Sequence, residues 1–295
     1  MASADPRVLL QKADKAAASA GSGFSFFGGR SEKYENAVEL YRDAANAFRI
    51  QKQGKEAGLA FERAADLQAD PNKLNEPDDA ANTRADAANA YWKSDPEDAA
   101  RCMDQAIEHY VKKGNFRRAA TAKQKLAELF EVEVGDQKKA LEQYECAASW
   151  YEDDRAEALA NKMWLKVADL AGLEGDYYKA SDIYEKVARS SINNNLMRWS
   201  VKEYLFKAGI CQLATNDLVG TNRAMERFRE IDHTFPAQRE HQLLVDLIQA
   251  LEQSDESAFS DKLFQFDQLS TLDKWKTTLL LRVKNNIQEE EEDFS

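Results

Sequence analysis

Histidines and paired carboxylates are the groups that most often carry catalysis or bind a metal, and this 295-residue chain contains both. Its three histidines are His109, His233 and His241, and one E-x-x-H sequence is present, from Glu230 to His233. A di-iron helical bundle needs two such sequences and two further carboxylates. No Ser–His–Asp arrangement suggests itself in the order of the residues. We therefore expect neither a metal site nor a catalytic site.

A second place for chemistry is the glycine-rich segment at residues 21–31, GSGFSFFGGRS. Glycine-rich loops bind phosphate when they carry Gly-Lys-Ser/Thr, or a G-x-G-x-x-G spacing after a strand, and this segment has neither. Its large side chains are Phe24, Phe26 and Phe27. The rings either fold onto the first helical segment, near Tyr34 and Val38, or contact a partner. The local sequence leaves both interpretations open.

The composition narrows the class of protein further. Hydrophobic residues make up 43% of the chain and charged residues 31%, with only 12 Gly and 5 Pro, which is typical of a charge-rich helical protein. The net charge of −12 argues against a general nucleic-acid binder, which is usually basic. Cys102, Cys146 and Cys211 lack metal-ligand spacing, so we expect reduced thiols. No apolar run approaches the roughly 18 residues of a membrane-spanning helix.

Alanine recurs at a regular spacing along much of the chain. The repeating phrases begin at Ala37, Ala57, Ala80, Ala99, Ala119, Ala140, Ala160 and Ala180, so consecutive starts lie 19 to 23 residues apart. Offsets 0, 4, 7, 8 and 11 of a phrase are mostly apolar, and these offsets share one face of an α-helix. Breaks such as GDQ at 135–137 and GDY at 175–177 separate the phrases. The pattern predicts one helix for each phrase.

Helices of this length, paired into units of about forty residues, are typical of helical-hairpin solenoids. The tetratricopeptide repeat (TPR) is the nearest template, although its Trp-x-x-Leu-Gly sequence and closing proline are missing. We therefore predict an all-α fold in three parts. A TPR-like helical-hairpin solenoid covers 1–195, a C-terminal helical bundle covers 196–288, and an acidic tail covers 289–295. Helices in the bundle are expected at 197–215, 217–231, 237–252, 256–269 and 272–288.

Ten stretches resemble those of one protein family. They are, in chain order, SFFGG, YRDAANAFR, AGLAFERAAD, KKGNFRRAA, ALEQYECAASWY, ALANKMWLKVADL, ASDIYEKV, KEYLFKAGICQL, LDKWKTTLLLRVKNNIQ and EEEEDFS. On these strings the chain resembles the soluble NSF attachment proteins over essentially its whole length. The resemblance implies an adaptor with no catalytic activity and no cofactor. Such adaptors bind the four-helix SNARE bundle, made of syntaxin, SNAP-25-like and synaptobrevin-like proteins, and recruit the hexameric AAA+ ATPase NSF, which disassembles the bundle.

The resemblance implies a basic surface for the SNARE bundle, on the concave side of the array. Lys162, within the string ALANKMW, is the clearest counterpart, and its offset in the repeat predicts an exposed side chain. Lys202 and Lys207 lie in a second matching string. Local charge adds Arg117, Arg118, Arg198 and Arg239. The alternative is that these side chains only solvate helix faces.

The resemblance also implies an acidic surface for NSF. Asp217 matches an acidic position of the family, and Glu252, Asp255 and Glu256 are candidates for its neighbours. The tail adds Glu289, Glu290, Glu291, Glu292, Asp293 and Phe294, the last standing where many members have leucine. Negative charge at a helix C-terminus opposes the helix dipole, so this run does not stabilise the helix that we expect to end near Gln288. A merely solvated tail is the alternative.

The family has a membrane-touching apolar loop at the position of the three phenylalanines, which favours the membrane interpretation for residues 21–31. Burying one Phe side chain contributes about 1.5–3 kcal/mol, so a single loop holds a membrane only weakly. Several copies around one membrane-anchored bundle gain avidity. We therefore expect a cytoplasmic protein, peripheral on membranes, that acts in vesicle trafficking and membrane fusion. A generic TPR-type peptide-binding scaffold is the alternative function.

Overall fold

A computed structural model describes residues 5–21 and 29–293, with side chains as far as Ile287. The described residues form fourteen α-helices and no β-strand, so the predicted all-α fold is confirmed. The chain divides into two compact units, Met1–Ala160 and Asn161–Ser295. The two units are described in turn.

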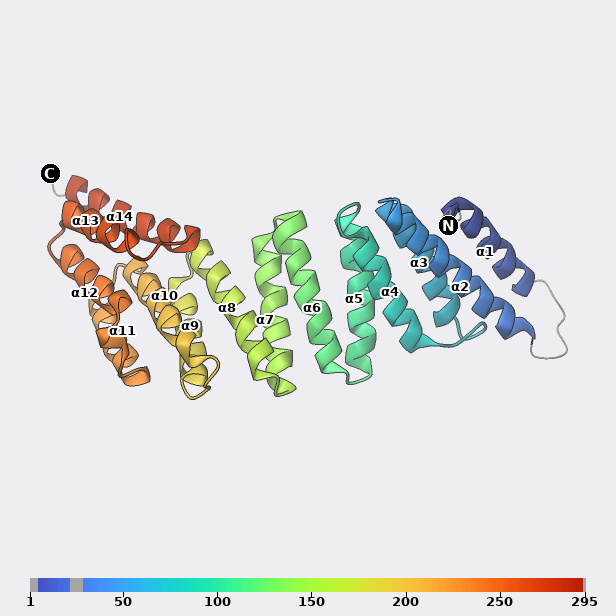
Figure 1. The fold of residues 1–295 in the computed structure, drawn as a ribbon, viewed down its shortest axis with the longest axis horizontal. Coiled ribbons are helices and arrows are strands. Elements are labelled where there is room, and N and C mark those ends of the chain that lie inside the picture. The colour runs from blue at the N-terminus through green and yellow to red at the C-terminus, as the bar shows by residue number, and fades with distance from the viewer. Residues whose placement is uncertain (1–4, 22–28, 294–295) are drawn as a thin grey trace. The chain divides into compact units, whose positions relative to one another are not determined.

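The first unit is a series of antiparallel helices in which each helix packs against the next one in the chain (Figure 1). Its helices are α1 (Pro6–Gly21), α2 (Gly29–Ile50), α3 (Gly54–Ala69), α4 (Pro77–Tyr91), α5 (Pro96–Lys112), α6 (Phe116–Leu129) and α7 (Gln137–Asp153). A π-helical turn, η1 (Phe130–Val134), prolongs α6. Packing between chain neighbours is what the predicted helical hairpins require.

The second unit begins within α8 (Glu157–Glu174), which starts in the first unit. It continues with α9 (Tyr177–Ser191), η2 (Arg198–Ser200), α10 (Val201–Ala214), α11 (Leu218–Ile231), η3 (Phe235–Ala237), α12 (Arg239–Glu252), α13 (Glu256–Asp267) and α14 (Lys274–Asp293). Helix α10 is central, because α9, α11, α12 and α14 all pack against it. By packing, α9 therefore groups with the later helices, and the domain boundary at residue 195 stays a prediction based on repeat phase.

The repeat alanines form the core, as predicted. Each of the following side chains is at most 3% exposed: Ala37, Ala57, Ala80, Ala99, Ala119, Ala140, Ala160 and Ala180. Their small size lets helix backbones approach closely, and buried tyrosines fill the remaining space. The hydroxyls of these tyrosines are also satisfied. Tyr144 donates to Glu131 at 2.6 Å, and Tyr41 donates to Asp14 at 2.6 Å, where burial and the nearby carboxylate raise the pKa of Tyr41 to about 12.

Six of the described helices begin with the same local signal, an aspartate at the N-cap. The side chains of Asp95, Asp136, Asp176, Asp217, Asp255 and Asp273 each accept a hydrogen bond from the backbone N–H three residues later. Before four of these caps stands a residue with positive φ, which ends the previous helix: Gly135, Gly175, Asn216 and Ser254. The first five caps are 38 to 41 residues apart, so from Asp95 to Asp255 the turn chemistry repeats once per helical hairpin.

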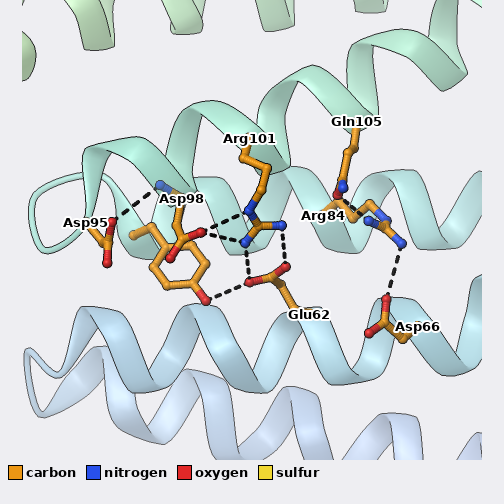
Figure 2. Close-up of polar contacts among 8 residues, drawn as sticks. Glu62, Asp66, Arg84, Asp95, Asp98, Arg101 and Gln105 are labelled. Atoms are coloured by element: carbon orange, nitrogen blue, oxygen red, sulfur yellow. Dashed lines mark hydrogen bonds and ion pairs between the residues drawn. The ribbon is translucent and has the colours of Figure 1, made fainter.

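A polar clamp joins three helices of the first unit (Figure 2). From α5, the two terminal nitrogens of Arg101 donate to the two carboxylate oxygens of Glu62 on α3, both at 2.8 Å. Glu62 also accepts a hydrogen bond from the hydroxyl of Tyr91 on α4 at 2.7 Å. A second arginine, Arg84 on α4, lies 3.2 Å from Asp66 on α3. Helix α3 is therefore held to both α4 and α5 by paired charges.

Helix α14 returns to cover the end of α8 in the second unit. The indole N–H of Trp275 donates to the backbone carbonyl of Asp169 at 2.8 Å. A Cβ atom at Gly172 would lie 2.9 Å from the ring of Trp275, so a glycine inside α8 makes room for the indole. The buried ammonium of Lys276 pairs with Glu203 at 2.5 Å and with Asp273 at 2.7 Å. These contacts fix α14 to α8 and α10.

Two predicted boundaries are corrected by the structure. Helix α1 lies within the predicted helical array, and its Ala13 and Ala20 pack in one cluster with Tyr34 of α2. Both ends of the predicted loop at 21–31 are helical, since α1 extends to Gly21 and α2 begins at Gly29. The helix expected to end near Gln288 continues to Asp293, which agrees with the high helix propensity of glutamate.

Candidate interaction surfaces

Four of the predicted basic residues lie at one end of the helices of the second unit, where α8, α10 and α12 begin and α9 ends (Figure 1). We call this the basic end: Lys162, Arg198, Lys202 and Arg239. Its elements are tied together by contacts. Asn161 of α8 donates to Ser190 of α9 at 3.0 Å, and Lys202 of α10 lies 3.0 Å from Glu240 of α12. The structure thus brings together residues that are up to 77 positions apart in the chain.

Lys162 is exposed, as its repeat offset predicted, and has no ion-pair partner among the described residues. Arg198 is also exposed and lies over the ring of Trp199, 5.7 Å from its centroid. Arg239 is exposed and donates to the hydroxyl of Ser270 at 3.2 Å. The charges of these three side chains are therefore open to an acidic partner.

Lys207 lies apart from the basic end and has a structural role. Its ammonium is 2.7 Å from Asp169 and 4.7 Å from the ring centroid of Trp275, and only 15% of its side chain is exposed. An ammonium between a carboxylate and an aromatic face is already well satisfied. We therefore leave Lys207 out of the proposed surface.

The two arginines nominated in the first unit lie at the start of α6. Arg117 pairs through its Nε with Asp154 at 2.5 Å. Arg118 lies over the ring of Tyr110 at 4.6 Å and donates to the side chain of Asn82. Both side chains are exposed, but each has a partner within the unit, so each would have to exchange that partner for a ligand.

Four of the predicted acidic residues gather in the second unit at the other end of α12, where α11 and α13 begin. We call this the acidic end: Asp217, Glu252, Asp255 and Glu256. The side-chain amide of Asn222 on α11 donates to Glu252 at 3.4 Å. Glu256 pairs with Lys284 of α14 at 3.0 Å, which places the C-terminal helix beside this end.

Two members of the acidic end also stabilise the fold. Asp217 accepts from the backbone N–H of Gly220 at 2.9 Å, and Asp255 accepts from that of Ala258 at 2.8 Å. Both side chains remain exposed, so an N-cap role and a binding role are compatible. A substitution that removes the cap would therefore affect stability as well as charge.

Several predicted residues lie outside the part that can be described. Phe24, Phe26 and Phe27 fall in residues 22–28, and Phe294 follows the last described residue. The positions of Glu289, Glu290, Glu291, Glu292 and Asp293 belong to α14, while their side chains lie outside the described set.

Sequence reasoning missed two exposed apolar side chains beside the basic end. Leu196 is 90% exposed and Trp199 is 78% exposed, between α9 and α10. Trp199 lines a depression of about 180 Å³ together with Arg198, Lys202 and Asp232. A signal was present in the sequence: NNNLMRW places large apolar residues in a polar break where the repeat phase has ended.

The described residues offer little for chemistry. They contain no cluster of three His, Cys, Asp or Glu side chains that could hold a metal ion. Burial raises the pKa of the Cys102 thiol to about 12, so this thiol is not a reactive nucleophile near neutral pH. None of the described helices combines the length and the apolar character needed to cross a membrane.

Helical hairpins that present charged, exposed ends define an interaction protein of the helical-repeat class. The family model described as "Soluble NSF attachment protein, SNAP" matches residues 4–288. The chain therefore belongs to the SNAP family. The family is named for attachment and not for a reaction, in agreement with the prediction that the chain is not an enzyme.

Curated relatives match over almost the whole chain. A Schizosaccharomyces pombe protein called a probable vesicular-fusion protein sec17 homolog is 52% identical over 292 residues, covering 99% of each chain. A Neurospora crassa protein of the same description is 50% identical over 291 residues, again covering 99% of each. The human alpha-soluble NSF attachment protein is 38% identical over 291 residues, covering 99% of this chain and 97% of the human one.

Proposed function

We propose that this protein is an adaptor that binds the SNARE four-helix bundle and attaches the AAA+ ATPase NSF to it, so that ATP hydrolysis separates the SNAREs. The observation that carries the proposal is membership of the SNAP family over residues 4–288. The relatives named as vesicular-fusion proteins support a role in vesicle traffic.

The arrangement of charge in the second unit supports two different partners. The basic end suits an acidic coiled coil, because like-signed side chains act together on the rate of encounter. The acidic end suits a basic surface, which we assign to NSF. Since α12 begins at the basic end and finishes at the acidic end, the two ends are separated by the length of that helix, and both partners can be bound at once.

The membrane contact is proposed for Phe24, Phe26 and Phe27, and the SNARE partners proposed are syntaxin-like, SNAP-25-like and synaptobrevin-like proteins. The family resemblance of the SFFGG string supports the first proposal. The core cluster of α1 and α2 supports it as well, because Tyr34 and Val38 already pack against α1 residues such as Ala13 and Ala20.

One experiment tests the function. Pre-assembled SNARE bundle, NSF and ATP-Mg are mixed with and without this protein, and bundle disassembly is followed over time. We expect disassembly only when the protein is present, and none when ATP is replaced by a non-hydrolysable analogue. If NSF stays idle while the protein binds a single short peptide, the alternative of a generic peptide-binding scaffold is the better description.

A further inference from the structure

An apolar groove of about 310 Å³ lies between α13 and α14. Its floor includes Leu280, which is buried, and its walls include Leu263 and Leu272. Two large side chains at its sides face solvent, Phe264 at 65% exposure and Leu281 at 55%. The groove thus combines a buried apolar base with exposed apolar walls.

The two exposed side chains are not needed for the core of the unit. Both helices already bury other large apolar residues: Phe259, Phe266, Leu279 and Val283. Phe264 and Leu281 lie outside this set, so the fold gains little from their apolar character. Adjacent exposed apolar side chains beside a preformed depression mark an interaction site.

Acidic residues lie in and beside the groove, which Asp267 of α13 helps to line. Lys284 lines the groove and pairs with Glu256 of the acidic end at 3.0 Å. Beyond Lys284, α14 continues through the acidic run at 289–293. From Leu281 to Glu289 is eight residues of helix, or about 12 Å, so one bound segment can reach both the groove and the acidic run.

We propose that this groove seats apolar side chains of a basic segment of the AAA+ ATPase. The inference rests on the proposed function and deepens it, since it gives the ATPase site an apolar part beside its acidic part. Charge complementarity selects the occupant. A segment seated in the groove lies beside Asp267 and near Glu256, and the sequence of α14 past the groove is acidic, which favours lysine and arginine next to its apolar residues.

The two parts of such a site respond differently to salt. Contacts between exposed charges weaken as salt is raised, because ions screen them. Apolar burial does not weaken in this way. The groove therefore supplies the fraction of ATPase affinity that persists at high salt.

The test uses the full chain bound to SNARE bundle, with Phe264→Ser and Leu281→Gln combined in one variant. Ile50→Gln is the matched control, because Ile50 is an apolar side chain with 77% exposure in the first unit. ATPase affinity is measured at low and at high salt. We expect the ATPase affinity of the double variant to fall at least tenfold, or about 1.4 kcal/mol, at both salt concentrations. The affinity of the control should not change. Replacing 289–293 with Gln and Asn should reduce affinity mainly at low salt.

A second measurement removes any dependence on folding of the double variant. A photoreactive phenylalanine analogue at position 264 should crosslink to the ATPase in the assembled complex. Unchanged ATPase affinity of the double variant, or crosslinks only to a second copy of this chain or to lipid vesicles, would overturn the assignment. Wild-type disassembly is measured in parallel, so a failure of the groove and a failure of the adaptor function are distinguished.

Discussion

Arg101 and Glu62 form a two-pronged ion pair between α5 and α3, with both N···O distances at 2.8 Å. Burial favours the neutral acid, but the hydrogen bonds from Arg101 and Tyr91 outweigh it, so the pKa of Glu62 lies below its ordinary value of 4.5. The ionised carboxylate is therefore more stable in the folded protein than in the unfolded chain. The pair stabilises the stacking of helices that are not adjacent in sequence.

We predict that Glu62→Gln destabilises the first unit by about 1–3 kcal/mol at neutral pH, since it removes one of the two carboxylates that pair with Arg101 and leaves only Asp98. Because the folded pKa is depressed, the stabilisation is present above the unfolded pKa and is lost as pH falls through the folded value. The free energy of unfolding, measured with urea at neutral and at acidic pH, should fall less with pH for the variant than for wild type. Arg63→Ala, which breaks an exposed pair with Asp14, is the control and should cost less than about 1 kcal/mol.

Charge reversal at the basic end should weaken SNARE binding at only a modest cost in stability, which arises because Lys202 loses its half-exposed ion pair with Glu240. Lys162→Glu and Lys202→Glu together are expected to lower binding several-fold at physiological salt and to reduce its salt dependence, because exposed charges act mainly through encounter. Pull-down with SNARE bundle over a salt series measures this. Lys207→Glu serves as a contrast: placed against Asp169, it should lower the melting temperature. Unchanged binding of the double variant would mean that the surface is misplaced.

The N-cap geometry allows the charge of Asp217 to be tested separately from its structural role. Asn accepts the same hydrogen bond from the N–H of Gly220, so Asp217→Asn should keep the stability of α11. Asp217→Ala should lower the free energy of unfolding by about 0.5–2 kcal/mol, because alanine cannot cap the helix. If the charge binds NSF, both variants weaken NSF binding equally, while only the alanine variant melts earlier. Normal NSF binding by the asparagine variant would remove Asp217 from the site.

Deletion of 289–295 should separate the two binding activities. The truncated protein keeps the basic end and the groove, so SNARE binding is expected to remain at the wild-type level. Stimulated disassembly should be abolished, because the acidic run that we propose engages NSF is missing. Disassembly at the normal rate by the truncated protein would refute this role of the tail.

Replacing Phe24, Phe26 and Phe27 with Ser is expected to slow disassembly of membrane-anchored SNARE bundles and to spare soluble ones. The reason is that each Phe side chain contributes about 1.5–3 kcal/mol of burial free energy, and in this proposal it does so only where a bilayer is present. Vesicle-bound and soluble substrates are compared in the same assay. Equal loss on both substrates would indicate that the rings belong to the folded core of α1 and α2.

The first unit was largely predictable from sequence, because a helix that packs on two chain neighbours keeps a regular apolar face. Ala99 and Ala140, for example, are buried as the pattern requires. Helix α10 shows why the pattern fails later. It is surrounded by four helices and is apolar on nearly every side, so no single face stands out.

The residue types of the candidate surfaces could be predicted from the sequence. Which of these side chains are already paired within the fold could not. Lys207 and Lys202 lie five residues apart in one matching string, yet Lys207 pairs with Asp169, 38 residues earlier, and is largely buried. Only the tertiary structure shows which charge is already satisfied. The sequence also did not indicate that Phe264 is exposed, because Phe259 and Phe266 lie close to it in the same apolar helix.

The attachment of α14 to α8 has a consequence for synthesis. Trp275 is translated 106 residues after Asp169, the residue to which it donates its hydrogen bond. In the first unit each helix can dock as soon as its chain neighbour leaves the ribosome, which corresponds to low contact order and fast folding. In the second unit the site at Gly172 stays uncovered until α14 emerges. A nascent chain therefore exposes this apolar surface for as long as it takes to translate α9 to α13, and it is during this interval that we expect chaperones to bind it.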